Sequence, residues 1–425
     1  MPLIEHLTGR EILDSRGRPT VEATCSLGHG LTASASVPSG ASTGKAEAVE
    51  LRDGDPRRYG GWGCRKAVAN LNGPIADAVR GRRFSGQAEF DEVLIALDGT
   101  DNKSRLGANS ILAASVAFAR AAAQQSHVSL WRYFAELAGG QPSALPRLTI
   151  NLFSGGRHAG EQVAIQDVLI VPTAAHTIDE ALVVAHNVYY AAAKLILDRY
   201  GMRLLRADEG GMAPDCRTPE EMIETALDAI QAAGYVAGSE VALALDVAAS
   251  HFRAPSGYHL GGNFLSSSAM IERLVRWVDR YPLVSVEDGL AEDDWDSWPA
   301  LCAAIGDRVL VVGDDLLCTN PFRIRRAISE RSCNSLLLKV NQIGTLTEAL
   351  AAYRLARSAG WAVTISVRSG ETEDHWAADL AVGWSGDQFK NGSITQSERL
   401  AKYNRLLAIE QETGLAVNTW PARTR

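Results

Sequence analysis

The stretch VLVVGDDLLCTNPFRIRRAISERSCNSLLLKV, residues 309–340, has the pattern of a strand, a helix and a second strand. Its two ends, VLVVG and SLLLK, are short and almost entirely apolar, as expected of strands that are buried on both faces. Between them PFRIRRAISER, residues 321–331, opens on proline and repeats apolar residues with a helical period. This order predicts parallel strands covered by helices.

The same unit recurs through the last two thirds of the chain. Further apolar runs are VALALDV (241–247), PLVSVEDG (282–289) and AVTISVRS (362–369). Amphipathic patterns such as TLTEALAAYRLARSAG (345–360) follow these runs and predict the covering helices. The number of units favours a closed α/β barrel over an open sheet.

The first third of the chain has a different organisation. Two segments, EILDSRGRPTVEATCSLG (11–28) and LTASASVP (31–38), predict antiparallel strands. They are followed by two apolar-striped segments that predict helices, GANSILAASVAFARAAAQ (107–124) and SLWRYFAELAG (129–139). We therefore expect a smaller N-terminal α+β domain before the barrel.

The boundary between the two domains is predicted at GGQPSALP, residues 139–146, which has two Gly and two Pro in eight residues. This places an N-terminal domain at residues 1–138 and the barrel domain at residues 146–425. Two domains also suit a chain of 425 residues, which is too long for one ordinary core.

Composition excludes several classes of function. The chain is 46% hydrophobic and 22% charged, and no apolar run approaches the ~20 residues that a membrane span requires. The net charge of −8, without a basic cluster, argues against nucleic-acid binding. The N-terminal MPLIEHLTGREILDSRG contains acids and no signal-peptide core, so we expect a cytoplasmic location with no membrane partner.

The six cysteines are scattered and form no CxxC pair, which indicates reduced thiols and neither a disulfide framework nor a zinc site. Lysine is scarce, with 7 among the 42 basic residues. Each lysine is therefore informative, because arginine cannot replace it where a cation must lose its proton.

Ionisable residues stand where five of the predicted strands end: Asp246, Glu287, Asp314, Lys339 and Arg368. Their separations are 41, 27, 25 and 29 residues (287−246, 314−287, 339−314, 368−339), roughly one strand–helix unit each. In a parallel barrel the carboxyl ends of the strands converge on one face, where such enzymes place their chemistry. One acid at a strand end can equally be a helix cap or a surface charge, but five in register favour a site.

Three carboxylates without a nearby Cys or His pair indicate a hard cation with oxygen ligands, and Mg²⁺ is the natural choice. A solvated acidic rim is the alternative. Lys339 ends an apolar strand, where burial and a nearby divalent cation would lower its pKa, so it is a candidate general base. A structural ion pair with one of the acids is the other interpretation of Lys339.

The Gly/Ser-rich loop VPSGASTGKAE, residues 37–47, contains GASTGK and invites comparison with a nucleotide-binding P-loop. A P-loop needs four residues between its glycines and Ser or Thr after the Lys. Here Gly40 and Gly44 enclose three residues and Ala46 follows Lys45, so the P-loop interpretation fails. A lid that closes over an anionic substrate, or a plain surface loop, remains.

Arg368 and Ser369 place a fixed cation beside a hydroxyl at the end of the 362–369 run, which suits an anion such as phosphate. A solvated strand end is the alternative. The residues after Gly370, from Glu371 to Asp374, have the composition of an acidic helix start.

The chain resembles the enolase family from end to end. The matching motifs, in chain order, are LDSRGRPTVE, VPSGASTG, GGRHAG, ADEGGMAP, ALDVAAS, SVEDGL, VGDDL, LLLKVNQIGTLTE, RSGETED and SERLAKYN. The resemblance implies an N-terminal α+β domain, a modified eight-stranded α/β barrel and assembly as a homodimer or a multiple of dimers. It also implies the dehydration of 2-phosphoglycerate to phosphoenolpyruvate.

The resemblance assigns roles to the metal-binding and base residues. Asp246, Glu287 and Asp314 would hold the tighter of two Mg²⁺ ions. Ser42 would bind the second Mg²⁺, which arrives with the substrate and its phosphate. Lys339 would take the proton from carbon 2.

The resemblance also assigns the remaining groups of the site. Glu209 would protonate the departing 3-hydroxyl, and Lys390 would stabilise the doubly charged carboxylate of the intermediate. Arg368 and Ser369 would bind the phosphate. His158, in GGRHAG, would contact the substrate.

Three positions depart from the family pattern. Val367 stands where enolases have His in SHRSGETED, and Asp167 stands where they have Glu after the GGxHA motif. His251 replaces a Glu, and His375 is expected to be a surface or capping residue that does not replace the missing His. The two main departures, Val367 and Asp167, fall on the side of the leaving hydroxyl, where Asp167 is a further substrate-binding candidate.

These observations leave three functions open. The first is ordinary dehydration of 2-phosphoglycerate. The second is altered chemistry on a phosphonate or phosphoenol substrate, for example the carboxyphosphonoenolpyruvate-forming step of phosphonate natural-product pathways. The third is a catalytically silent binding protein, against which the retention of Lys339, Lys390 and all three carboxylates argues.

Overall fold

The computed structural model describes residues 1–201 and 205–419. The chain begins with a three-stranded antiparallel sheet in the order β1 (Ile4–Leu13), β2 (Pro19–Leu27) and β3 (Leu31–Ser36). The first reversal is closed by hydrogen bonds from Gly17 N to Asp14 O and from Asp14 N to Arg18 O. Gly17 has φ of +69°, a conformation that disfavours a side chain. The predicted antiparallel strands are confirmed.

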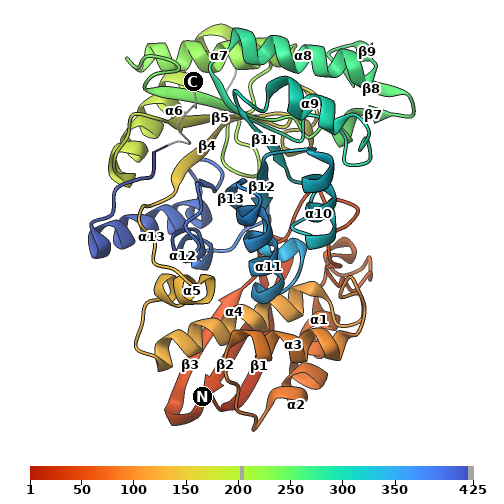
Figure 1. Cartoon of the computed structure of the whole chain (residues 1–425), viewed down its shortest axis with the longest axis vertical. Coiled ribbons are helices and arrows are strands. Elements are labelled where there is room, and N and C mark those ends of the chain that lie inside the picture. Colours follow the sequence, from red (N-terminus) through yellow and green to blue (C-terminus); the bar gives the residue numbers. More distant parts are fainter. Residues whose placement is uncertain (202–204, 420–425) are drawn as a thin grey trace.

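Helices cover this sheet and connect it to the rest of the chain. They are α1 (Arg65–Asn70), α2 (Ala76–Val79), α3 (Gln87–Asp98), α4 (Ala108–Gln125) and α5 (Leu130–Ala138). α4 packs on β2 and β3, and 15 of its 18 residues are buried. Its many alanines allow neighbouring elements to approach the helix closely on all sides. Figure 1 shows this sheet and its helices at one end of the molecule, below the barrel.

The second part is a closed eight-stranded α/β barrel, which confirms the predicted fold class. Around the barrel the strands are β10 (Leu283–Glu287), β11 (Leu310–Gly313), β12 (Ser335–Leu338), β13 (Ala362–Ser366), β14 (Gln388–Lys390), β4 (Arg147–Ser154), β5 (Asp167–Pro172) and β6 (Val241–Asp246). The helices of this part are α6 (Ile178–Tyr200), α7 (Pro219–Ala232), α8 (Ser267–Arg280), α9 (Trp298–Ile305), α10 (Pro321–Glu330), α11 (Leu346–Ser358), α12 (Trp376–Gly383) and α13 (Ser397–Thr413). A small antiparallel sheet of β7 (Arg253–Ala254), β8 (Gly257–Leu260) and β9 (Asn263–Leu265) follows β6.

One strand departs from the parallel arrangement predicted from the later units. β5 is antiparallel to both of its neighbours, β4 and β6, whereas the other pairs of the barrel are parallel. The connection from β4 to β5 contains a single 3-10 turn, Gly156–His158, and no crossover helix, so the chain returns in the opposite direction. Two consecutive helices, α6 and α7, then reverse it again before β6.

Local sequence signals explain where several barrel helices begin. α6 and α7 each start after a threonine whose hydroxyl accepts a hydrogen bond from the backbone N–H of a glutamate three residues later: Thr177 with Glu180, and Thr218 with Glu221. The acidic helix start expected at residues 371–374 is wrong, because α12 begins at Trp376. Two of those acids instead form ion pairs, Glu371 with Lys402 and Asp374 with Arg120.

Two apolar clusters stabilise the fold. The larger one runs between strands and helices and continues into the N-terminal part. The smaller one consists of Leu169, Val171, Ala242, Ala244 and Val284, which alternate along β5, β6 and β10 and fill the barrel interior. Among the helices of the described residues, none has the length and apolar character that crossing a membrane requires.

Candidate active site

The carboxyl ends of the barrel strands collect the charged residues that the sequence singled out. β6 ends at Asp246, β10 at Glu287 and β14 at Lys390, and Asp314 and Lys339 directly follow β11 and β12. The sheet register places Glu287 beside Asp246 and Ser366 beside Lys390. These groups therefore share one face of the barrel.

Lys390 joins two of the expected metal ligands. Its ammonium donates to Asp246 Oδ2 at 2.8 Å and to Glu287 Oε1 and Oε2 at 2.8 and 2.7 Å. Burial alone would raise the pKa of Asp246, but Lys390 outweighs it and lowers that pKa to about 2. Burial and then the neighbouring Asp246 raise the pKa of Glu287 well above its usual value.

Lys339 is paired in a similar way with the third carboxylate. Its ammonium lies 2.6 Å from Asp314 Oδ2, and Asp314 Oδ1 accepts from Gln342 Nε2 at 2.8 Å. Burial alone would lower the pKa of Lys339, as the sequence argument held, but the Asp314 carboxylate outweighs burial and raises that pKa. The candidate base and the predicted metal ligand are thus in direct contact.

Two further aspartates, Asp288 and Asp315, lie beside Asp314. Asp288 accepts from the backbone N–H groups of Asp314 at 3.0 Å and Asp315 at 2.7 Å, and carboxylate oxygens of all three lie within 4.8 Å of one another. Asp288 has φ of +41°, a strained conformation for a residue other than glycine. Burial and then Asp314 raise the pKa of Asp315 to about 8. The sequence analysis did not single out Asp288 or Asp315, although both follow the strand-end acids directly.

The residues at this face fit a hard divalent cation. Carboxylate oxygens are the only acidic donors among Asp246, Glu287 and Asp314, and such oxygens are the ligands that a hard cation prefers. Within the described part of the chain, Asp246, Glu287 and Asp314 do not all lie within 4.8 Å of one another, since Lys390 contacts the first two and Lys339 the third. A bound cation would take over carboxylate oxygens that the lysines now contact.

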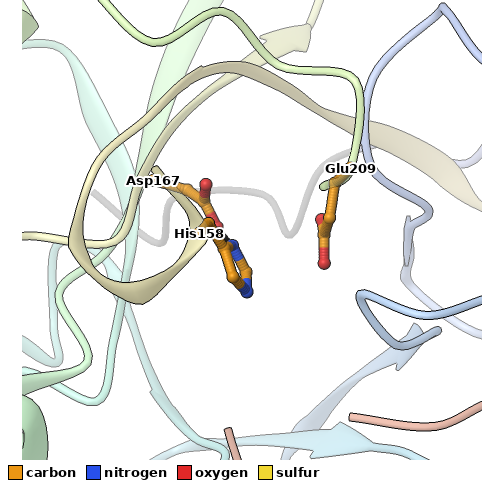
Figure 2. A group of neighbouring side chains, drawn as sticks. All are labelled: His158, Asp167 and Glu209. Carbon is orange, nitrogen blue, oxygen red and sulfur yellow. Dashed lines mark ion pairs between the residues drawn. The ribbon is translucent and has the colours of Figure 1, made fainter. Parts of the chain in front are cut away.

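A second cluster is formed by His158, Asp167 and Glu209 (Figure 2), and it adjoins the first group because the register of β5 and β6 pairs Asp167 with Asp246. Ligand atoms of the three lie within 4.8 Å of one another, and all three side chains are buried. Figure 2 shows His158 and Asp167 side by side, with Glu209 facing them from a separate loop. The sequence places them 9 and 42 residues apart (167−158, 209−167), so only the fold brings them together.

A buried carboxylate faces the imidazole of this cluster. His158 Nδ1 lies 3.3 Å from Asp167 Oδ2. Burial alone would lower the pKa of His158, but the Asp167 carboxylate raises it to about 9. Burial would likewise raise the pKa of Glu209, but His158 and then Arg399 outweigh it and lower that pKa.

Asp167 is fixed by residues of the neighbouring strand β4. Its Oδ1 accepts from Asn151 Nδ2 at 2.7 Å and from Ser154 Oγ at 2.8 Å. Burial raises the pKa of Asp167 although His158 opposes this effect. Although Asp167 is shorter than the Glu of the family pattern, Asn151 and Ser154 fix its position and His158 lies beside it.

The environment of Val367 is apolar. The residue is 6% exposed and belongs to the main hydrophobic cluster, and its backbone N–H donates to Lys390 O at 3.2 Å. His375 does not replace the missing imidazole, because it precedes α12, is about half exposed at the side chain and pairs with Asp379 at 3.3 Å. His251, the third departure, has a buried Nδ1 without a hydrogen-bond partner among the described residues. Burial and then Arg157 lower the pKa of His251 to about 4.

Arg368 and Ser369 lie against the Gly/Ser-rich loop. Arg368 Nη2 donates to Ser42 O at 2.7 Å, and Ser369 Oγ accepts from Ala41 N at 2.7 Å. Their backbone carbonyls accept from the buried guanidinium of Arg399 at 2.7 and 2.6 Å. The residues expected to bind phosphate and the loop that carries Ser42 are thus in contact.

A closed α/β barrel that gathers three carboxylates, two lysines and a buried arginine at its strand ends defines a class of acid–base enzymes that act on small anions. The N-terminal α+β part contributes the loop that covers this face.

Comparison with known proteins identifies the family within this class. A family model described as "Enolase, N-terminal domain" matches residues 4–134, and one described as "Enolase, C-terminal TIM barrel domain" matches residues 142–421. Enolase 1 of Methylococcus capsulatus is 48% identical over 416 residues, which cover 97% of this chain and 98% of that protein. The chain belongs to the enolase family, and it is an enolase-type enzyme, a carbon–oxygen lyase.

Proposed function

We propose that the chain catalyses the Mg²⁺-dependent dehydration of 2-phosphoglycerate to phosphoenolpyruvate. The observation that carries this proposal is the pairing at the strand ends, where Lys339 contacts Asp314 and Lys390 contacts Asp246 and Glu287. A base and a cationic receptor for a carboxylate then flank the residues that would hold the metal. The name and extent of the similar protein from Methylococcus capsulatus support the same activity.

In this proposal Asp246, Glu287 and Asp314 hold the first Mg²⁺, and Ser42 contributes to a second that arrives with the substrate. When bound, the cations supply positive charge that stabilises the second negative charge developing on the substrate carboxylate, as in enolase-superfamily enzymes. Lys339 removes the proton from carbon 2, and Lys390 donates hydrogen bonds to the substrate carboxylate. Arg368 and Ser369 orient the phosphate.

The departing hydroxide needs a proton on the opposite side of the substrate. Glu209 is the proposed donor, but its lowered pKa keeps it ionised before substrate binds. The neighbouring His158, whose pKa is about 9, holds a proton at neutral pH and is the proposed source for Glu209. Asp167 lies 3.3 Å from this imidazole and raises its pKa.

The direct test is to incubate the purified protein with Mg²⁺ and 2-phosphoglycerate and to follow phosphoenolpyruvate formation. We expect continuous formation that stops when EDTA is added and resumes with excess Mg²⁺. A purified, folded protein that forms no phosphoenolpyruvate at any Mg²⁺ concentration would exclude the proposed substrate.

A second candidate function is supported by the apolar, buried Val367 and by the shortened Asp167. Valine can neither donate nor accept a proton, and both residues belong to the side where the leaving group is expected. An enzyme with the same metal, base and phosphate residues but a rebuilt leaving-group side would act on a related phosphonate or phosphoenol substrate. The formation of carboxyphosphonoenolpyruvate is one reaction of this kind.

Restoring the family residue separates the two candidates. If 2-phosphoglycerate is the native substrate, Val367→His should raise its turnover, by up to about 10²-fold for an added proton-transfer group. Adding Asp167→Glu should increase the gain more than additively, because the two positions are expected to flank one leaving group. The measurement is kcat/KM for phosphoenolpyruvate formation.

The matched control is His375→Ala, which removes an imidazole that the structure places outside the site. It should leave turnover unchanged. If the pocket is built for another substrate, the parent should turn over 2-phosphoglycerate slowly, and the double variant should gain that activity while losing the native one. A parent as fast as ordinary enolases, and indifferent to both substitutions, would contradict the specialised function.

A further inference from the structure

The loop from Ser39 to Glu47 is packed tightly against the barrel face. A side chain at Gly40 would overlap Nη2 of Arg368, and a Cβ at Gly44 would lie 2.5 Å from Cys318 Sγ. Both positions therefore depend on the absence of a side chain. The loop rests on Arg368 at one end and on the segment after β11 at the other.

Glu47 ends this loop and forms an ion pair with Arg368. Arg368 Nη1 lies 2.9 Å from Glu47 Oε2 and its Nη2 lies 3.3 Å from Glu47 Oε1. The side chains are only 4% and 7% exposed for Arg368 and Glu47. A buried cation whose partner is removed must find another partner or move, so Glu47 constrains where the guanidinium can lie.

The same carboxylate also holds its own loop. Glu47 Oε1 accepts from Gly44 N at 3.0 Å, and Arg368 Nη2 donates to Ser42 O at 2.7 Å. One ion pair therefore fixes the loop on both sides of Thr43. Gln342 lies 3.5 Å from Glu47 Oε1 and donates to Asp314 Oδ1, which extends these contacts to the metal-binding face.

The geometry leaves part of the guanidinium for a ligand. Arginine has five N–H groups, and the three hydrogen bonds to Glu47 and Ser42 use three of them. Its Nε–H and one Nη1–H make no hydrogen bond within the described part of the chain. Glu47 thus occupies one edge of Arg368 and leaves donors for an anion elsewhere on the same group.

We propose that Glu47 is a positioning residue, which holds Arg368 and the loop that carries Ser42 in the arrangement needed for the substrate phosphate. This inference rests on the proposed role of Arg368 in phosphate binding. Glu47 itself touches neither substrate nor reacting atoms in this assignment. Its effect on catalysis passes through Arg368 and the loop.

The first test needs no substrate and uses amide hydrogen exchange of the whole protein. In Glu47→Gln, which keeps the shape but removes the charge, exchange of residues 39–47 should accelerate by about tenfold or more, with the rest of the barrel unchanged. The control is Asp293→Asn, because Asp293 pairs with Lys45 of the same loop at 3.1 Å through exposed side chains. Its exchange should match the parent, since exposed pairs contribute little.

The second test measures kcat/KM in a double-mutant cycle with Arg368→Lys, using whichever substrate the parent turns over. Glu47→Gln should lower kcat/KM by about 10²-fold, a loss typical of a misplaced binding group. Because both residues act through one contact, the double variant should be no worse than Arg368→Lys alone. Gly40→Ala, whose added Cβ would overlap Nη2 of Arg368 and displace the guanidinium, should reproduce the loss if Glu47→Gln does not fold.

Other outcomes would overturn the proposal. Additive effects in the cycle would mean that Glu47 does not act through Arg368. Unchanged loop exchange, or a lower melting temperature with kcat/KM unchanged, would assign Glu47 a structural role alone. Failure to turn over 2-phosphoglycerate would contradict the proposed substrate but leave the exchange result intact, so the two failures are distinguishable.

Discussion

Lys339→Ala is expected to lower turnover by about 10⁴-fold, the upper range for loss of a positioned general base. Lys339 is buried at the barrel face and its ammonium contacts Asp314, so no water-exposed amine can take its place without rearrangement. The specific readout is exchange of the carbon-2 proton of 2-phosphoglycerate with solvent deuterium. That exchange should disappear with the turnover, because both depend on the same proton transfer.

Lys194→Ala is the matched control for this prediction. Lys194 pairs with Asp198 on the surface of α6, and its side chain is 76% exposed. Its removal should change neither turnover nor exchange. Exchange that continues undiminished in Lys339→Ala would assign the base to another residue.

Glu287→Gln should lower Mg²⁺-dependent turnover by at least about 10³-fold, since a catalytic cation contributes several kcal/mol of charge stabilisation. The substitution keeps the shape of the side chain but removes the charge that attracts a cation. It also removes half of the carboxylate pair that surrounds Lys390. Isothermal titration with Mg²⁺ should show weaker binding, which separates metal loss from a defect in proton transfer.

Glu272→Gln provides the control, because Glu272 is exposed on α8 and only distantly paired with Arg276. It should bind Mg²⁺ like the parent. Full activity of the parent in excess EDTA, or unchanged Mg²⁺ affinity in Glu287→Gln, would rule out the proposed metal site. Asp246→Ala and Asp314→Ala should behave as Glu287→Gln does.

The fold class followed from residues whose local preference and tertiary environment agree. Apolar runs such as residues 335–338 are strands because both faces are buried, and helices such as α6 begin where Thr177 and Glu180 cap them. The domain division at residues 139–146 stays a prediction. The antiparallel direction of β5 was not predictable from its composition, because a strand buried on both faces looks the same in either direction.

The charged strand ends were predictable as a group because the chain repeats one unit and parallel strands end on one face. Their individual partners were not. Lys390 could have faced Asp167 or Glu209, and only the closure of the barrel brings β14 close enough for its ammonium to contact Asp246 and Glu287. Likewise, the pKa of Lys339 is raised because the tertiary structure places its ammonium beside Asp314.

The amino-acid sequence by itself determined the strand–helix order, the scarcity of lysine, the identity of the strand-end acids and the departures at Val367 and Asp167. The tertiary structure alone decided the pairing of His158 with Asp167, the ion pair of Arg368 with Glu47 and the hydrogen bond from the backbone N–H of Asp314 to Asp288. The physical reason is that local sequence sets backbone preference and burial over a few residues. Contacts between side chains 9 to 321 residues apart (167−158, 368−47), such as His158 with Asp167 or Glu47 with Arg368, depend on how the whole barrel closes.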